Sequence, residues 1–164
     1  MKIDKKIPGK KISGVKNLRI AIIVSDFNRT ITDNLAKGAK FALKEKGVTD
    51  KNIRIFKAPG AFEIPVIASS LIHNIKENFD GIITLGCIIK GETAHFEYIA
   101  SSVSNTLNFL SAQERIPIGF GILTCYNKQQ ALDRCRIKPV TPEGNKGYES
   151  AMAVLETLNV IGKI

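Results

Sequence analysis

Four short runs of branched aliphatic residues recur along the chain, and they limit its fold more than any other feature. The runs are LRIAIIVS at 18–25, IRIFKA at 53–58, GIITLG at 81–86 and IPIGFGILT at 116–124. They are nearly continuous in Val, Ile and Leu instead of alternating with polar residues. Strands have this composition when helices cover both faces of a parallel sheet. The runs therefore predict four strands buried on both sides.

Helical patterns separate these runs. Apolar residues recur at three- or four-residue steps within 31–43, 66–76 and 96–110, a short helix is expected at 128–136, and the last helix begins near residue 146. The alternation of strands and helices predicts an α/β fold. We expect a three-layer αβα sandwich around a four-stranded parallel sheet with right-handed crossovers.

Length and composition indicate one globular domain. A chain of 164 residues is long enough for a single core, and we expect a basic arm at 1–16 followed by one domain at 17–164. No apolar run approaches the roughly 18 residues that cross a bilayer, and the N-terminus does not resemble a signal peptide. The three cysteines, Cys87, Cys125 and Cys135, form no CxxC pair, so we expect buried thiols and a reducing cytoplasm.

The net charge of +9 raises the question of nucleic acid binding. Five lysines lie in the first eleven residues, and most of the others are scattered over the predicted helices. Neither an RNP-type aromatic motif nor zinc-finger spacing is present. A solvated basic arm is the simpler interpretation, and an anionic substrate would also be attracted by this charge.

Ligands of open parallel sheets bind beyond the carboxyl ends of the strands. The segments expected there are SDFN at 25–28, APGAFE at 58–63, CIIKGETAH at 87–95 and TCYN at 124–127. In KGETAH a glycine turn leads from a strand into a helix, so free amides near Glu92 and Thr93 would form an anion site, with Thr93 as N-cap. His95 would stand beside that anion and could move protons. Turns of this kind also occur for capping alone, and a histidine there also packs locally.

Other candidate residues have equally plain alternatives. Glu63 lies between two prolines at a helix start, where it either complements the helix dipole or accepts hydrogen bonds from ligand hydroxyls. Phe27 and Phe120 are expected near carboxyl ends of strands, where each ring either stacks on a flat heterocycle or joins the core. Arg134 either reaches an anion or is an ordinary surface arginine, and GNKG at 144–147 opens the last helix.

Taken together, the motifs resemble those of the lumazine synthase family. The order SDFN, PGAFEIP, GCIIKGETAHFEY, PIGFGILT, ALDR and GNKG spans residues 25 to 147. The resemblance implies a flavodoxin-like fold and a transferase of riboflavin biosynthesis. Its reaction would condense 5-amino-6-(D-ribitylamino)uracil with 3,4-dihydroxy-2-butanone 4-phosphate, giving 6,7-dimethyl-8-ribityllumazine, phosphate and water. No metal or organic cofactor is implied.

The resemblance also implies roles for individual residues. The pyrimidine and its ribityl chain would be held by Phe27, by the backbone of Ala61 and Phe62, by Glu63, by the backbone of Cys87, Ile88 and Ile89, and by Phe120 of a neighbouring subunit. The phosphate would be held by the amides of Glu92 and Thr93 and by Arg134 of the adjacent subunit, with Lys146 assisting near it. His95 would carry protons, with Arg134 beside it in the catalytic set. The Glu92 carboxylate must then point away from the phosphate or pair with Lys90 or Arg134.

The resemblance further implies a homo-oligomer with active sites between subunits and riboflavin synthase as a functional partner. The segment CRIKPVTPE at 135–143 is longer than the corresponding turn of capsid-forming relatives. A pentamer or a pair of pentamers is therefore favoured over a sixty-subunit capsid. Neither a nucleic acid nor a membrane partner is expected.

Three other functions remain open. A non-catalytic lumazine or flavin carrier would keep Phe27 and Glu63 but could dispense with His95 and Arg134. A receiver-type signalling domain would need an acidic cluster around a phosphoacceptor, and only Asp26 is available. A nucleic-acid binder would rest on charge alone, with steep salt dependence as its signature.

Overall fold

The computed structural model describes residues 14–139, 141 and 144–162. Four parallel strands form one sheet in the order β2-β1-β3-β4. They are β1 (Ile20–Ser25), β2 (Ile53–Ala58), β3 (Gly81–Ile89) and β4 (Ile118–Cys125). The predicted parallel sheet is confirmed.

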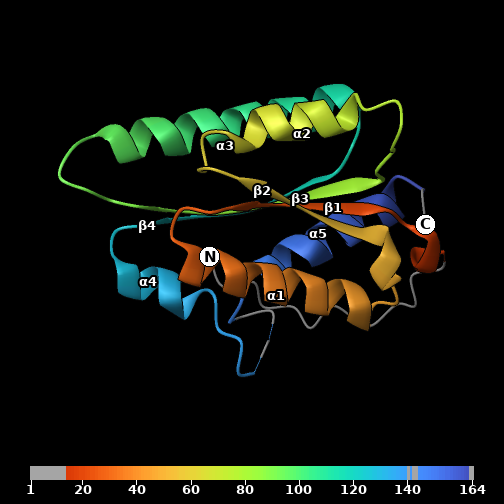
Figure 1. The fold of residues 1–164 in the computed structure, drawn as a ribbon, viewed down its shortest axis with the longest axis horizontal. Coiled ribbons are helices and arrows are strands. Elements are labelled where there is room, and N and C mark those ends of the chain that lie inside the picture. Colours follow the sequence, from red (N-terminus) through yellow and green to blue (C-terminus); the bar gives the residue numbers. More distant parts are fainter. Residues whose placement is uncertain (1–13, 140, 142–143, 163–164) are drawn as a thin grey trace.

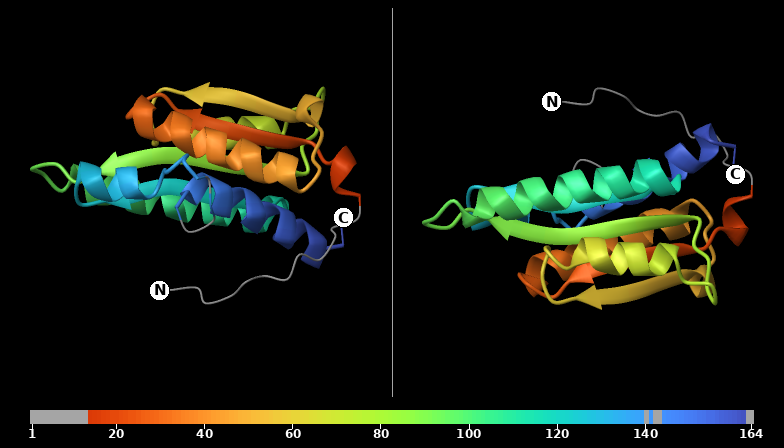
Figure 2. Two further views of the ribbon diagram at one scale, coloured as in Figure 1. Left: turned by 90° about the horizontal axis from the view of Figure 1, so that it is seen from below. Right: turned by 90° about the horizontal axis from the view of Figure 1, so that it is seen from above.

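Within the described residues, five α-helices cover the sheet in two layers. Helices α2 (Ile64–Ile72) and α3 (His95–Glu114) lie on one face, and α1 (Arg29–Glu45), α4 (Lys128–Asp133) and α5 (Lys146–Val160) lie on the other (Figure 1). Figure 2 shows each helix layer from its own side. Two short 3₁₀ turns, Val15–Asn17 and Asp50–Asn52, precede β1 and β2. The three-layer αβα sandwich is therefore confirmed.

The central strand β1 shows why its sequence is nearly all apolar. Ile20, Ile22 and Val24 pack into the core beneath α1 and α5. The alternate residues Ala21 and Ile23 pack into a second core beneath α2 and α3. Because successive side chains of a strand point to opposite faces, a strand between two helix layers must be apolar at every position.

Three details of the predicted elements are wrong, and one of them is the short helix α4, which ends at Asp133 instead of residue 136. Strand β2 lies at the edge of the sheet and is not buried on both sides, since Ile55 is 46% exposed. Helix α2 ends at Ile72, four residues before the expected end, and Ile75 lies beyond it and is 95% exposed. Backbone turns at 73–77 replace the last helical turn, with an Asn74 side chain accepting from the Lys76 amide.

The close contact between α1 and α5 depends on Asn145, which is fully buried. Its side-chain oxygen accepts from the amides of Gly147 and Tyr148, and its Nδ2 donates to the carbonyls of Asn34 and Arg136. A Cβ on Gly147 would lie 2.0 Å from the Leu35 carbonyl oxygen. GNKG therefore does more than turn the chain, because it caps α5 and lets the helix touch α1.

In the part of the chain that the structure describes, no helix combines the length and apolar character needed to cross a membrane.

Replacing Gly147 by Ala tests this helix contact. The new methyl group would press on backbone that cannot easily move, so we expect the free energy of unfolding to fall by roughly 1–3 kcal/mol or more. Gly91→Ala is the matched control, because nothing lies within 4 Å of a Cβ at that position. Denaturant unfolding at one protein concentration measures both variants. Equal stability of Gly147→Ala and the wild type would contradict the close approach.

Candidate active site

Strand β3 extends beyond its neighbour β1 at the carboxyl edge of the sheet. β1 pairs with β3 only as far as Leu85, whereas β4 pairs with β3 as far as Ile89. The end of β1 instead continues along β2, because the Asp26 amide donates to the Ala58 carbonyl. The backbone of residues 86–89 therefore has a strand neighbour on one edge only.

Asn28 lies opposite this open edge, and sequence reasoning gave it no role. Its Nδ2 donates to the Cys87 carbonyl at 3.0 Å, in the place where a longer β1 would have paired. The backbone of Asn28 is left-handed, with φ of 57°, and α1 begins at the next residue. Asn tolerates this conformation better than most residues. The sequence did offer a signal for Asn28, because it is an Asn that lies between an aromatic residue and the start of a predicted helix.

A cavity of about 820 Å³ opens beside this edge. Nine of the predicted site residues line it: Phe27, Ala61, Phe62, Glu63, Cys87, Ile88, Ile89, Thr93 and His95. They come from the β1–α1 turn, the β2–α2 turn, the end of β3 and the start of α3. The carboxyl edge of the sheet thus gathers segments that lie up to 68 residues apart in the sequence.

Three aromatic rings at this cavity are open to solvent, and one of them, Tyr98, is 75% exposed. Phe27 is 69% exposed and Phe62 is 59% exposed. Exposed rings of this size are available to stack on a flat ligand, since burying them against it removes apolar surface from water.

The β2–α2 turn places a carboxylate at the cavity. Glu63 is the N-cap residue of α2, and Pro65 lies in the first turn of that helix. A Cβ on Gly60 would lie 2.8 Å from the Glu63 Oε2, so the carboxylate folds back over the glycine. The sequence expectation that the two prolines hold Glu63 near the helix start is confirmed.

The loop between β3 and α3 projects from the end of the molecule in both Figure 1 and Figure 2. Its residues 90–95 are all exposed. Within the described residues, the amides of Glu92 and Thr93 donate no hydrogen bond, so both are available to an anion. Helix α3 begins at His95 with Ala94 as N-cap, so the predicted cap at Thr93 is wrong. Thr93 lies one residue before the N-cap, and its hydroxyl accepts from the His95 amide, the first amide of the helix, at 3.4 Å.

Four predicted site residues do not line this cavity: Phe120, Glu92, Arg134 and Lys146. Phe120 is the third residue of β4, far from the carboxyl end where it was expected, and its ring is 47% exposed. The Arg134 guanidinium donates to the Gln130 carbonyl, and Lys146 pairs with Glu149. Among residues 14–139, 141 and 144–162, Glu92 forms no ion pair, so the alternative pairing with Lys90 or Arg134 is not found.

Arg134 and Lys146 nevertheless lie next to each other. The Lys146 amide donates to the Arg134 carbonyl at 2.8 Å, and the bridge between Cys135 and Asn145 joins the same two segments. The backbones of two cationic residues are therefore paired at a place outside the cavity of their own chain.

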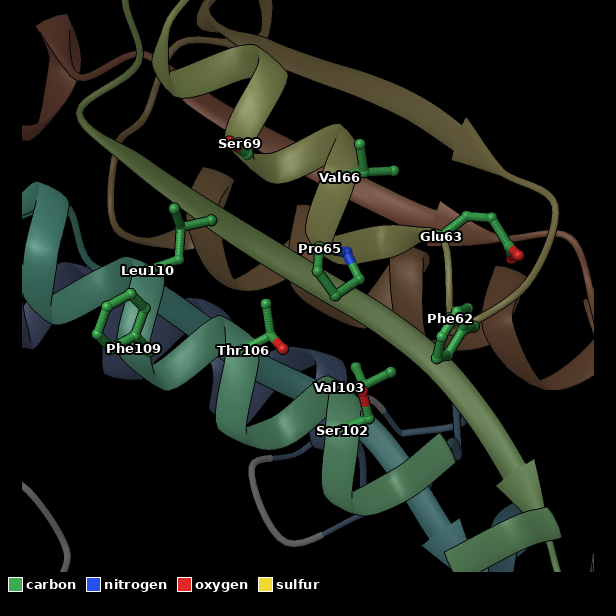
Figure 3. Close-up of a pocket in the computed structure, with 10 residues that line it drawn as sticks. All are labelled: Phe62, Glu63, Pro65, Val66, Ser69, Ser102, Val103, Thr106, Phe109 and Leu110. Carbon is green, nitrogen blue, oxygen red and sulfur yellow. The ribbon is translucent and has the colours of Figure 1, made fainter. Parts of the chain in front are cut away.

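A second, apolar groove of about 540 Å³ lies between α2 and α3. Figure 3 shows Pro65 and Val66 of α2 on one side and Val103, Thr106 and Leu110 of α3 on the other. Val66 and Phe109 are each more than 60% exposed. Phe62, Glu63 and Ser102 line both hollows, so the groove continues into the cavity.

Among the described residues, no group of three or more His, Cys, Asp or Glu side chains is arranged to hold a metal ion.

The comparisons with known proteins agree with one another. A family model described as 6,7-dimethyl-8-ribityllumazine synthase matches residues 17–162. The chain is also 46% identical over 144 residues to the 6,7-dimethyl-8-ribityllumazine synthase of Blochmanniella pennsylvanica (strain BPEN), and this match covers 87% of each chain. The segments that line the cavity all lie within the region matched by the family model.

Three buried thiols lie under the carboxyl edge of the sheet. Cys87, Cys125 and Cys135 are each no more than 2% exposed and share one core cluster. Burial raises the pKa of the Cys87 thiol to about 12, and the neighbouring thiols Cys125 and Cys135 add to the shift. Burial also raises the pKa values of Cys125 and Cys135. The prediction of buried thiols is confirmed, and the Cys87 carbonyl accepts from the Asn28 side chain beside the cavity.

We expect these thiols to be unreactive in the folded protein at pH 8. Iodoacetamide should label none of them within the time that labels all three in guanidinium, because the reactive species is the exposed thiolate. The unfolded chain ionises Cys87 near its ordinary pKa of 9.0, while the folded chain keeps the proton until about 12. The free energy of unfolding should therefore fall as the pH rises above 9. Rapid labelling of the native protein would contradict this burial.

Proposed function

This chain belongs to the 6,7-dimethyl-8-ribityllumazine synthase family, and we propose that the cavity at the carboxyl edge of its sheet is the active site. The enzyme is a transferase of riboflavin biosynthesis. It condenses 5-amino-6-(D-ribitylamino)uracil with 3,4-dihydroxy-2-butanone 4-phosphate and releases 6,7-dimethyl-8-ribityllumazine, phosphate and water. The observation that carries the site assignment is that one cavity gathers nine of the residues implied by the family motifs.

We propose that the pyrimidine substrate lies along the open edge of β3. Phe27 stacks on the heterocycle, the backbone of Cys87 and Ile89 supplies hydrogen bonds to its polar edge, and Ile88, whose peptide groups face β4, contacts it through its side chain. In a strand, the N–H and C=O groups of residues two apart point to the same edge. The Cys87 carbonyl points to the open edge of β3, so the N–H and C=O of Ile89 also face the cavity. The ribityl hydroxyls are held by the backbone of Ala61 and Phe62 and by the Glu63 carboxylate.

We propose that the phosphate of the second substrate is bound by the loop before α3. The free amides of Glu92 and Thr93 point to it, and the positive end of the α3 dipole adds to their effect. The Glu92 side chain, which is exposed, lies away from the phosphate. His95, in the first turn of α3, transfers protons between the reacting groups.

The enzyme acts on small molecules and assembles into an oligomer, and we propose that its active sites lie between subunits. Phe120, Arg134 and Lys146 do not line the cavity of their own chain. A second copy that covers the apolar groove would bring its Phe120 to the pyrimidine and its Arg134 and Lys146 to the phosphate. The exposed rings along this groove support the proposal, because contiguous apolar surface of this kind marks interfaces.

For the size of the assembly, we propose a pentamer or a pair of pentamers instead of a sixty-subunit capsid. The length of the segment 135–143 supports it, although residues 140, 142 and 143 lie outside the described part of the chain. Light scattering should therefore give the mass of five or ten chains of 18.0 kDa. A mass near one megadalton would contradict the proposal.

We also propose that the enzyme is cytoplasmic and that riboflavin synthase is its functional partner, because that enzyme consumes the lumazine product.

We propose further that residues 17–164 form a single domain after a basic arm at 1–16. The family match over residues 17–162 supports this division, and residues 1–13 of the arm lie outside the described residues.

The direct test supplies both substrates to the purified protein and follows the lumazine chromophore together with released phosphate. Equal amounts of the two products are expected. Absence of the chromophore in the presence of both substrates would contradict the proposed site and its reaction.

Arg134→Ala tests the phosphate contact. We expect the KM for the butanone phosphate to rise and kcat/KM for that substrate to fall by roughly 10–100-fold, as for loss of one charge-assisted hydrogen bond. Arg136→Ala is the matched control, because Arg136 is nearby and 63% exposed and pairs only with Asp133 among the described ion pairs. An unchanged KM and kcat/KM in Arg134→Ala would show that this arginine does not bind the phosphate.

A further inference from the structure

The loop that presents the proposed phosphate site has little support of its own. Residues 90–95 are all exposed. Within the described chain its backbone is tied at the start by the Lys90 amide, which donates to the Cys125 carbonyl. At the end, the Ala94 carbonyl accepts from the first turn of α3 and the His95 amide donates a long bond to Thr93, so residues 91–93 have no backbone bond of their own with any described residue. A loop with so few internal bonds needs an outside contact to hold its amides in one direction.

Tyr126 provides that contact at both ends of the loop. Its ring centroid lies 5.7 Å from the Lys90 Nζ and 6.3 Å from the centroid of the Phe96 ring. The first distance lies within the range of cation–π attraction, and the second lies within the range of attraction between two aromatic rings. Lys90 opens the loop, and Phe96 directly follows His95 and lines the cavity. One side chain therefore touches the residues that bracket the whole anion-binding turn.

The backbone of Tyr126 is itself held firmly. Its amide donates to the Gln130 side chain at 2.9 Å, and the Gln130 amide donates to the Asn127 side chain at 2.9 Å. These two bonds fix the turn from β4 into α4 much as a capping box does, except that Gln130 accepts from the amide before the N-cap residue Asn127. The ring therefore extends from a well-fixed backbone position, directly after the last residue of β4.

We propose that Tyr126 is a positioning residue for the phosphate half of the reaction. Its ring clamps Lys90 and Phe96, so that the amides of Glu92 and Thr93 and the imidazole of His95 keep their directions toward the cavity. The inference rests on the proposed function of this loop. The ring carries the effect: Tyr126 is 70% exposed, and within the described residues its hydroxyl has no hydrogen-bond partner.

Tyr126→Ala and Tyr126→Phe separate the ring from the hydroxyl. In Tyr126→Ala we expect the KM for the butanone phosphate to rise roughly 3- to 10-fold, the size of effect that loss of two exposed ring contacts allows. The KM for the pyrimidine should stay within about twofold, because its proposed contacts lie on β3 and on Phe27. Tyr126→Phe should behave as the wild type in both.

The melting temperature of each variant distinguishes positioning from a purely structural role. A clamp on an exposed loop predicts unchanged melting in Tyr126→Ala together with the selective rise in KM. The proposal is overturned if Tyr126→Ala matches the wild type for the phosphate substrate, if both KM values rise together, or if Tyr126→Phe is as impaired as Tyr126→Ala.

Binding of inorganic phosphate, measured by titration calorimetry on the wild type and both variants, keeps this test independent of turnover. Weaker binding in Tyr126→Ala alone supports the clamp, and equal binding in all three proteins overturns it. If the wild type binds phosphate but makes no lumazine from the two substrates, the proposed reaction fails while the clamp is still tested.

Discussion

The site depends on a difference in strand length, because β3 extends beyond its neighbour β1 at the carboxyl edge of the sheet. β1 leaves β3 after Leu85 and follows β2, so the last residues of β3 keep an unpaired backbone edge. Unpaired peptide groups at a sheet edge bind whatever offers complementary donors and acceptors. Asn28 satisfies one of them at Cys87 and prevents the edge from closing on the rest of β1. The cavity exists because the sheet ends unevenly.

This architecture suits a reaction whose main difficulty is bringing two molecules together. Holding two reactants in register can supply roughly 7–11 kcal/mol, whereas one positioned acid or base contributes about 3–5 kcal/mol. A rigid edge of backbone groups, flanked by the exposed rings of Phe27 and Phe62, is well suited to the first task. A single histidine at the start of α3 is sufficient for the second. Orientation by the sheet should therefore dominate catalysis, with proton transfer as the smaller contribution.

The sequence predicted the features that depend on local composition and on parallel-sheet geometry. Continuous apolar runs gave the four strands, and the carboxyl-end rule brought Phe27, Glu63, Cys87 and His95 to one cavity. It missed features that depend on where strands stop relative to their neighbours. The edge strand β2 and the early end of α2 have only weak local signals, namely Arg54 and Lys57 within the strand and Asn74 after the helix, and tertiary packing decides which strand lies at the edge. Phe120 was misplaced for the same reason, since an apolar run shows that a strand exists but gives its bounds poorly.

The two halves of the cavity differ in how far a single chain completes them. The half proposed for the pyrimidine is built from strand ends and a turn between two prolines. The half proposed for the phosphate is an exposed loop, and the cations proposed for it, Arg134 and Lys146, lie outside the cavity of their own chain. In water such a loop holds an anion weakly, because solvent screens both its amides and its helix dipole. A neighbouring subunit would correct both deficiencies at once, by adding charge and by excluding water. Assembly and phosphate binding should therefore be linked, and the loop is where that linkage acts.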